Sequence, residues 1–301
     1  MKFTVYQESR QGGRANNEDR VGYAYSREAL VLIVADGMGG HLHGEVASHI
    51  TVQFVLEAFR REATPRLDDP ARFLEHTIKR AHHAIIDYAL GRRLPDTPKT
   101  TCVACVVQDG IARWAHAGDS RLYLVREGRL LARTRDHSRV QQLIDEGRVR
   151  EEALQAHPDR NRIFNCLGGH APPSVDLSPE WALRGADVVF LCTDGLWGPL
   201  PAPAIVQALA AGDVTVASPS LLNAAEARAR QDCDNLSVVA ITWMEDAPTA
   251  QHVVSTRTLP SDAVSTQLEA FGAGATTDMT DEEIERAIDE IRAAIRRNSS
   301  R

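Results

Sequence analysis

Short apolar runs bounded by Gly, Asp or Asn dominate the hydrophobic pattern of the chain. Each run holds several β-branched residues, a composition and length that favour strands buried on both faces. Two tight-turn pairs, Asp109-Gly110 and Glu127-Gly128, separate further runs and predict two consecutive antiparallel hairpins. The predicted strands are Ala29–Ala35, Thr101–Val107, Ile111–Ala117, Arg121–Val125, Arg129–Thr134, Val188–Cys192 and Leu236–Trp243.

Helical patterns interrupt these strands. Apolar residues line one face of the segment Glu45–Arg60, and Asp69 followed by Pro70 is typical of a helix N-cap and first turn, here continuing to about Ala89. Paired strands with grouped helices predict an α+β sandwich rather than a regular βαβ repeat. Shorter helices are expected at Arg139–Glu146, Ala202–Leu209 and Ser218–Ala229, the last with Pro219 in its first turn.

Composition narrows the classes of protein that the chain can belong to. Its 301 residues are 43% hydrophobic, enough for a sizeable core, and its net charge of −7 argues against general nucleic-acid binding. No apolar run reaches the ~20 residues of a membrane-spanning helix, and the first residues lack the apolar segment of a secretory signal. The five cysteines do not form a disulfide framework. We expect a cytoplasmic protein that contacts no membrane.

The last part of the chain differs from the rest. Residues 246–279 are rich in Ala, Thr, Ser, Gly and Pro and predict a flexible linker after a domain at 1–245. A capping pair, Thr280 and Glu283, then opens a predicted amphipathic helix at 280–297. That helix could bind a partner, dock on the domain, self-associate or remain solvated, and its sequence does not decide between these roles.

Carboxylates stand where the predicted strands begin or end. Asp36-Gly37 and Asp194-Gly195 each end an apolar run, and Asp234 precedes another. Any one Asp-Gly pair is explained by a turn. Several carboxylates at one sheet edge would repel one another unless a cation neutralised them, and oxygen ligands without His or Cys favour Mg²⁺ or Mn²⁺ over Zn²⁺. The residues by themselves predict a candidate divalent-metal site and leave the reaction open.

The ordered set of motifs resembles the metal-dependent Ser/Thr protein phosphatases, the PPM or type 2C family, in its bacterial form. The similarity covers about residues 3–245. The matching segments are RANNEDR (14–20), VADGMGGHLHGEVAS (34–48), KTTCVACVV (99–107), AHAGDSRLYLVREG (115–128), TRDHSRVQQLIDEG (134–147), HPDRNRIFNCLGG (157–169), VVFLCTDGLW (188–197) and DNLSVVAITW (234–243).

The resemblance implies a four-layer α-β-β-α sandwich with two central antiparallel sheets and a two-metal site between them. It assigns metal binding to the Asp36 carboxylate, the Gly37 carbonyl, Asp194 and Asp234. Arg14 matches the arginine that holds the substrate phosphate. Two further acids complete the implied set: Asp19 as a direct or water-mediated ligand and Asp119, with Asp194, at a third metal site.

The implied reaction is direct hydrolysis of phosphoserine or phosphothreonine by water activated between two Mn²⁺ or Mg²⁺ ions. Met38 stands where animal members carry a general-acid His, which leaves that role unassigned. Residues 138–165 match the flap that selects substrates, and Asn165-Cys166-Leu167 departs there from the usual pattern. The expected partners are phosphorylated proteins, including a Ser/Thr kinase and its substrates. A module that binds phosphoproteins without turnover is the alternative, which the retained acids disfavour.

Overall fold

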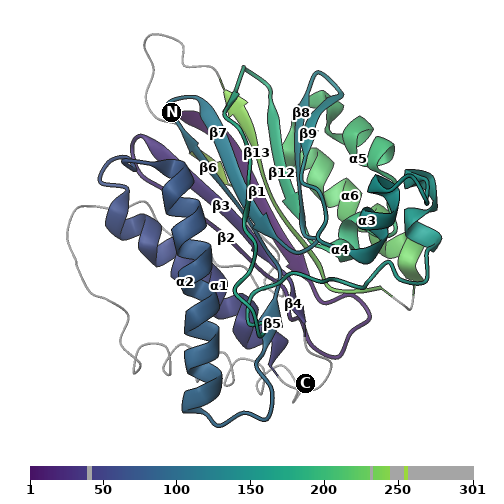
Figure 1. The fold of residues 1–301 in the computed structure, drawn as a ribbon. Helices are drawn as coiled ribbons and strands as arrows, with labels where there is room; N and C mark the ends of the chain where they lie inside the picture. Colours follow the sequence, from purple (N-terminus) through teal and green to yellow (C-terminus); the bar gives the residue numbers. More distant parts are fainter. Residues whose placement is uncertain (39–42, 231–232, 245–253, 257–301) are drawn as a thin grey trace, which may run out of the picture. The chain divides into compact units, whose positions relative to one another are not determined.

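Two β-sheets lie face to face at the centre of the fold (Figure 1). The computed structural model describes residues 1–38, 43–230, 233–244 and 254–256. The first sheet is antiparallel except for its edge strand β14, which runs parallel to β1. Its strands in spatial order are β14 (Val254–Thr256), β1 (Lys2–Arg10), β13 (Leu236–Met244), β12 (Val188–Cys192), β8 (Arg121–Arg126) and β9 (Arg129–Arg133).

The second sheet is antiparallel throughout. A separate two-stranded ribbon, β4 (Gly37–Met38) with β5 (Lys99–Thr100), begins directly after Asp36. The order of the second sheet is β10 (Asp176–Leu177), β7 (Ile111–Ala117), β6 (Cys102–Gln108), β3 (Ala29–Ala35) and β2 (Arg20–Tyr25), with β11 (Trp181–Ala182) also pairing with β7.

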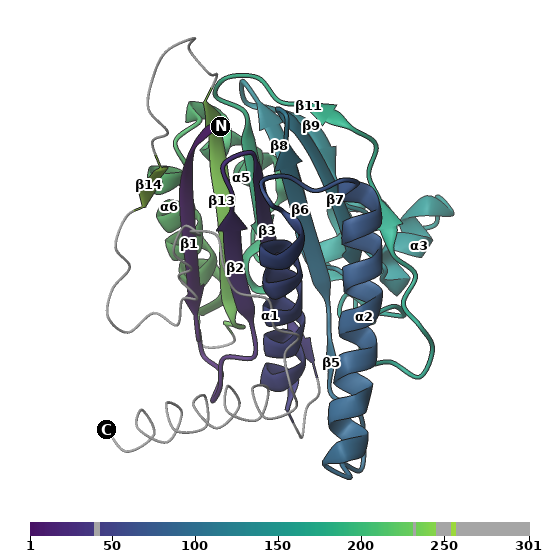
Figure 2. The same ribbon diagram turned by 90° about the vertical axis from the view of Figure 1, so that its left-hand side faces the viewer.

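Helices cover both outer faces of the sheet pair. The long helices α1 (Gly44–Glu62) and α2 (Pro70–Gly91) lie over the second sheet, and Figure 2 shows them side by side in front of it. On the other side lie α4 (Asp194–Trp197), α5 (Ala202–Ala208) and α6 (Val214–Ala229). The predicted α-β-β-α sandwich is confirmed. The remaining elements are α3 (Arg139–Asp145) and two 3₁₀ turns, η1 (Glu151–Ala156) and η2 (Leu209–Ala211).

Strand alternation divides the core into layers. Leu32, Leu191 and Val239 point between the two sheets and are fully buried. Phe190 and Leu222 belong to a second cluster, between the first sheet and its helices. Burying one such side chain contributes about 1.5–3 kcal/mol. The inter-sheet layer therefore holds together the two sheets whose ends carry the acidic residues.

The predicted strands agree with the observed ones to within one or two residues. Asp109 and Gly110 both have positive φ, 54° and 71°, as a tight two-residue hairpin requires. The helix predicted at Ser218–Ala229 is wrong at its start. It begins at Val214 because Asp213 is the true N-cap, accepting a 2.9 Å hydrogen bond from the Thr215 N–H, and Pro219 lies inside the helix.

Two predictions about the chain's organisation lie largely outside the described residues. Of the linker predicted at 246–279, only Val254–Thr256 is described, where it pairs with β1 as β14. The helix predicted at 280–297 is entirely outside them. Among the helices that the structure does describe, none has the length and apolar character needed to cross a membrane.

The start of α2 provides a test of local stability. Asp69 accepts hydrogen bonds from the Ala71 and Arg72 N–H groups at 3.0 and 3.1 Å, as predicted for an N-cap. Asp69→Ala is expected to lower the unfolding free energy by about 1 kcal/mol. Thermal denaturation should then show a melting temperature about 2–4 °C lower. Asp68→Ala, at the exposed neighbouring residue, is the control, and equal losses in both variants would contradict the capping role.

Candidate functional site

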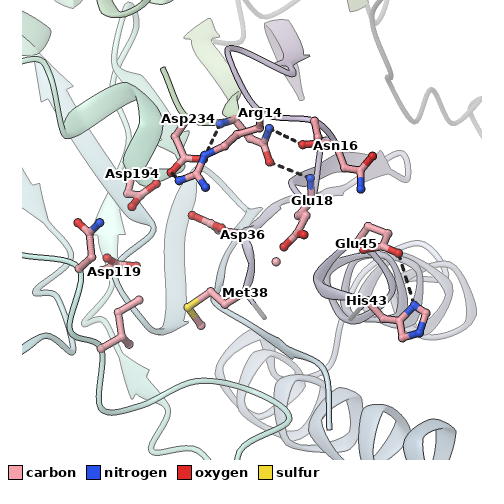
Figure 3. A pocket seen from close by; sticks show the side chains of 15 residues that line it. Arg14, Asn16, Glu18, Asp36, Met38, His43, Glu45, Asp119, Asp194 and Asp234 are labelled. Carbon is pink, nitrogen blue, oxygen red and sulfur yellow. Dashed lines mark hydrogen bonds and ion pairs between the residues drawn. The ribbon is translucent and has the colours of Figure 1, made fainter. Parts of the chain in front are cut away.

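Acidic residues from both sheets meet at one end of the sandwich. Asp36 follows β3 of the second sheet, Asp194 opens α4 just after β12 of the first, and Asp234 lies two residues before β13. Asp119 lies in the link between β7 and β8, where the chain crosses from one sheet to the other. These four residues line one cavity of about 570 Å³, and Figure 3 shows Asp36, Asp119 and Asp194 gathered on the same side of it.

Asp19 lies behind this cavity rather than in its wall. Its carboxylate is fully buried before β2 and accepts a 2.8 Å hydrogen bond from Thr193 Oγ1. The Thr193 hydroxyl in turn accepts a 3.0 Å bond from the Ser237 N–H. Asp19 is therefore fixed to the segment that carries Asp194, although the two are far apart in the sequence.

Burial makes this group of acids electrostatically costly. It is the largest cause of the raised pKa of Asp19, to about 7, and of Asp194, to about 6. The pKa values of Asp36 and Asp119 are raised well above the usual range, first by burial and then by repulsion from neighbouring carboxylates. A hydrogen bond between the carboxyl groups of Asp36 and Asp194 partly relieves this repulsion and lowers the pKa of Asp194.

Within the described residues, the only ion pair to these five acids joins Arg14 Nη2 and Asp234 Oδ2, at 2.7 Å. The buried Asp119 Oδ1 has no hydrogen-bond partner in the same residues. Carboxylate oxygens that repel one another, with one oxygen left unpaired, form the donor set that hard divalent cations prefer. The residues present therefore fit Mn²⁺ or Mg²⁺.

The glycines after two of these aspartates are required by close backbone packing. A Cβ on Gly37 would lie 2.3 Å from the Gly44 carbonyl oxygen, and one on Gly195 would lie 2.0 Å from the Asn235 carbonyl oxygen. Both distances are far below any contact that a side chain could make. The Asp-Gly pairs are therefore not simple turns, because each glycine lets a second chain segment approach the acidic residue.

Arg14 lies on a loop between β1 and β2 that Asn235 holds at both ends. The Asn235 side chain donates 2.8 and 2.9 Å hydrogen bonds to the carbonyls of Gln11 and Asn16, and its Oδ1 accepts one from the Glu18 N–H. Sequence reasoning missed this role, although Asn235 follows the predicted ligand Asp234. The Arg14 side chain lies over Asp234 at the mouth of the cavity (Figure 3).

The Asp119 loop is held by an aromatic contact and a buried ion pair. Trp197 Nε1 donates a 3.0 Å hydrogen bond to the Asp119 carbonyl. The Arg121 guanidinium lies 3.6 Å from the centre of the Trp197 ring and makes two bonds, 2.9 and 2.7 Å, to the Asp136 carboxylate. The two charges of that pair neutralise each other, so Arg121 does not neutralise the acid cluster.

A second group of potential metal ligands, His116, His137 and Asp176, has ligand atoms within 4.8 Å of one another. His137 Nδ1 faces two N–H donors, from Gly118 and the Asn165 amide, so its proton belongs on Nε2, 3.2 Å from Asp176. A protonated Nε2 donates to the carboxylate and has no lone pair for a metal. We therefore interpret this group as a hydrogen-bonded support for Gly118, the neighbour of Asp119.

The other walls of the cavity come from segments to which the sequence assigned no metal-binding role. Thr101 Oγ1 accepts from the Asp36 N–H at 3.1 Å, so the Lys99-Thr100-Thr101 motif positions an acidic residue. Asn161 and Ile163 reach the cavity from the segment predicted to form a flap. Met38 also lines the cavity, and His41, three residues further along the sequence, lies outside the described residues. Glu18, the acidic neighbour of Asp19 in the sequence, also lines the cavity, and the wall residues that the sequence did not single out are Ala15, Asn16, His43 and Glu45.

Comparisons with known proteins agree with this geometry. The family model described as protein phosphatase 2C matches residues 7–212. The serine/threonine protein phosphatase PstP of Mycobacterium tuberculosis is 36% identical over 217 residues, which are 70% of this chain and 40% of that protein. The serine/threonine phosphatase Stp of Listeria innocua is 32% identical over 191 residues, 62% of this chain and 75% of that protein. The chain thus spans less than half the length of the first of these relatives.

Solved structures show the same fold. The M. tuberculosis PstP/Ppp structure superposes with a TM-score of 0.71 at 31% identity, covering 81% of this chain and all of that one. A PstP catalytic domain in complex with two manganese ions gives a TM-score of 0.67 at 30% identity, covering 81% of this chain and 99% of that one. The family model covers more than half of the chain, from β1 to the residue before the cap of α6. With the fold and the acidic site in agreement, the chain belongs to the protein phosphatase 2C family.

Proposed function

We propose that this protein is a metal-dependent phosphatase that hydrolyses phosphoserine and phosphothreonine in proteins. The observation that carries the proposal is the group of clustered, partly or fully buried carboxylates beside Arg14, at the end of the sandwich. Family membership and the two manganese ions of the PstP catalytic domain support the same reading. The proposed location is the cytoplasm, where reducing conditions suit the five free cysteines.

In the proposed site, Asp36, Asp194 and Asp234 hold the principal pair of metal ions together with the Gly37 carbonyl. Asp119 and Asp194 contribute to a third position, and Asp19 supports the cluster from behind. Bound Mn²⁺ or Mg²⁺ acidifies water and neutralises charge that develops on the phosphoryl oxygens. The protein contributes fixed carboxylates, since Thr101, Thr193 and Trp197 anchor the segments that carry them.

Arg14 is the proposed phosphate-binding residue. Its side chain is 59% exposed at the cavity mouth, and its planar guanidinium can offer two parallel N–H donors to a phosphate. It contacts Asp234 in this structure, so it can approach substrate without leaving the acidic site. The loop that carries Arg14 is set by Asn235, which limits the entropy lost when phosphate binds.

Arg14→Ala is expected to raise KM for a phosphothreonine peptide about tenfold, with a smaller effect on kcat, because it removes a charge-assisted contact to the phosphate. Steady-state kinetics in Mn²⁺ measure both constants. Arg72→Ala, at an exposed residue on α2, is the matched control. A change confined to kcat would assign Arg14 to the chemical step instead of to phosphate binding.

The test of the function itself is Mn²⁺-dependent phosphate release from phosphothreonine and phosphoserine peptides by the full chain. Release that is absent with Mn²⁺ and with Mg²⁺ would overturn the proposal. A phosphoprotein-binding module without turnover would bind the same peptides and release nothing. The partners we propose are a Ser/Thr kinase and its substrates, and the segment at 280–297 is proposed as a helix that contacts a partner or a second copy.

A further inference from the structure

A second recess adjoins the acidic cavity. It encloses about 410 Å³ and shares four wall residues with the cavity: Arg14, Asn161, Asp194 and Asp234. Its remaining walls come from η1 and the segment after it, from the end of α4, and from the last turn of α6. A peptide whose phosphate lies at Arg14 therefore has neighbouring residues within reach of this recess.

The recess differs from the cavity in charge. Arg160 and Arg228 line it, whereas the cavity adds four acids to the shared ones: Glu18, Asp36, Glu45 and Asp119. Of the two acids in the recess wall, Asp234 already pairs with Arg14, and Asp194 is half-buried and belongs to the carboxylate cluster. The positive side of the site thus lies beside the place proposed for the phosphate.

Neither arginine forms an ion pair among the described residues, although the charge of Arg160 is close enough to lower the pKa of Asp194. The Arg160 guanidinium makes one hydrogen bond in the described part of the chain, 3.0 Å from Nη1 to the Gln155 carbonyl, which leaves most of its donors free. Arg228 is exposed on α6, and the part of the chain that the structure describes offers its side chain no hydrogen bond or ion pair. Two unpaired guanidinium groups in one concave wall attract anions more strongly than the same groups on a flat surface.

We propose that this recess binds a carboxylate side chain of the substrate, so that the enzyme prefers phosphopeptides with Glu or Asp a few residues from the phosphorylated residue. This inference rests on the proposed phosphatase function. Arg160 and Arg228 are the specificity-determining residues, and Arg14 holds the phosphate between them and the acid cluster. Two or three extended residues span about 7–10 Å, a separation that suits adjoining recesses.

The experiment compares three phosphothreonine peptides of equal length: one with Glu two and three residues before phosphothreonine, one with Glu two and three residues after it, and one with Ala at all four positions. The readout is the ratio of kcat/KM for each Glu peptide to kcat/KM for the Ala peptide. We expect a ratio of at least about five for one Glu peptide in the parent protein. Arg228→Gln and Arg160→Gln should each lower it about threefold, the effect of an exposed ion pair. Arg72→Gln is the matched control.

Charge reversal makes the test stricter. Arg228→Glu should bring the ratio to one or below, and raising the salt concentration should lower the parent's ratio because exposed charges are screened. Equal ratios in the parent and both Gln variants would overturn the inference. So would a lower melting temperature of Arg228→Gln with an unchanged ratio, which would assign Arg228 to the helix end alone. Absence of turnover on all three peptides would instead contradict the phosphatase function.

Discussion

Asp36→Asn is expected to lower Mn²⁺-dependent phosphate release at least about a thousandfold while making the metal-free protein more stable. The rate falls because a proposed ligand loses its charge, and metal ions supply several kcal/mol of transition-state stabilisation. The stability rises because desolvation and the neighbouring acids raise the pKa of Asp36, so that its negative charge is costly in the folded state. The amide can still donate to Asp194, the carboxylate that Asp36 contacts.

The two readouts are steady-state hydrolysis of a phosphothreonine peptide and thermal unfolding in EDTA and in Mn²⁺. In the parent, Mn²⁺ should raise the melting temperature, as any ligand that binds only the folded state does. In Asp36→Asn, that increase should shrink greatly. Asp87→Asn, at an exposed position on α2, should behave as the parent. If Asp36→Asn retained its metal-dependent rise, Asp36 would not be a ligand.

Metal-free protein is expected to lose stability as the pH rises from about 5 to 7.5, by several degrees Celsius in melting temperature. Burial is the main cause that raises the pKa of Asp194 to about 6 and of Asp19 to about 7. The folded protein therefore holds protons that the unfolded chain, with ordinary carboxyl pKa values near 4, has released. Since the folded state binds more protons in this window, unfolding becomes easier with each step up in pH.

Thermal unfolding in EDTA at a series of pH values measures this trend. His49 opposes it, because burial lowers its pKa to about 4 and its contribution grows as the pH rises. The comparison is therefore made with Asp19→Asn, which keeps His49 and removes one titrating carboxyl. Its melting temperature should fall less steeply with pH than that of the parent. With Mn²⁺ present, the parent should no longer lose stability, since the ion favours ionised ligands. Equal slopes for parent and Asp19→Asn in EDTA would contradict the assignment.

The sequence located Asp36, Asp194 and Asp234 because each adjoins a clear apolar strand pattern, whereas Asp19 precedes β2, a strand that the pattern did not predict. Asp36 and Asp194 end runs of fully buried residues, and the observed strands β3 and β12 end where the apolar runs end. A pattern of this kind locates a carboxylate at a sheet edge but does not say which edges meet. Only the resemblance to a known family connected them, and the packing of the two sheets brings four of the five acids into one cavity.

What the sequence missed depends on contacts between distant segments. β1 was not predicted because Gln7, Glu8 and Ser9 interrupt its apolar pattern, although all three are buried. Tyr6 donates to Glu8, which pairs with Arg10, while Ser9 Oγ accepts hydrogen bonds from Asn17 and Ser237 on other segments. The prediction that Pro219 lies in the first turn of a helix also used only local sequence, and it placed the start of α6 too late. Arg228 belongs to none of the motifs in the sequence, and only the folded structure shows that it lines a recess.

The layer between the two sheets has a consequence for the acidic site. Asp36 is attached to one sheet and Asp194 to the other, so the spacing between these carboxylates is set by the side chains that separate the sheets, about 10 Å apart. Leu32 and Leu191 are part of this spacer. The volume of the side chains between the two sheets thus sets the distance between the carboxylates that each sheet carries.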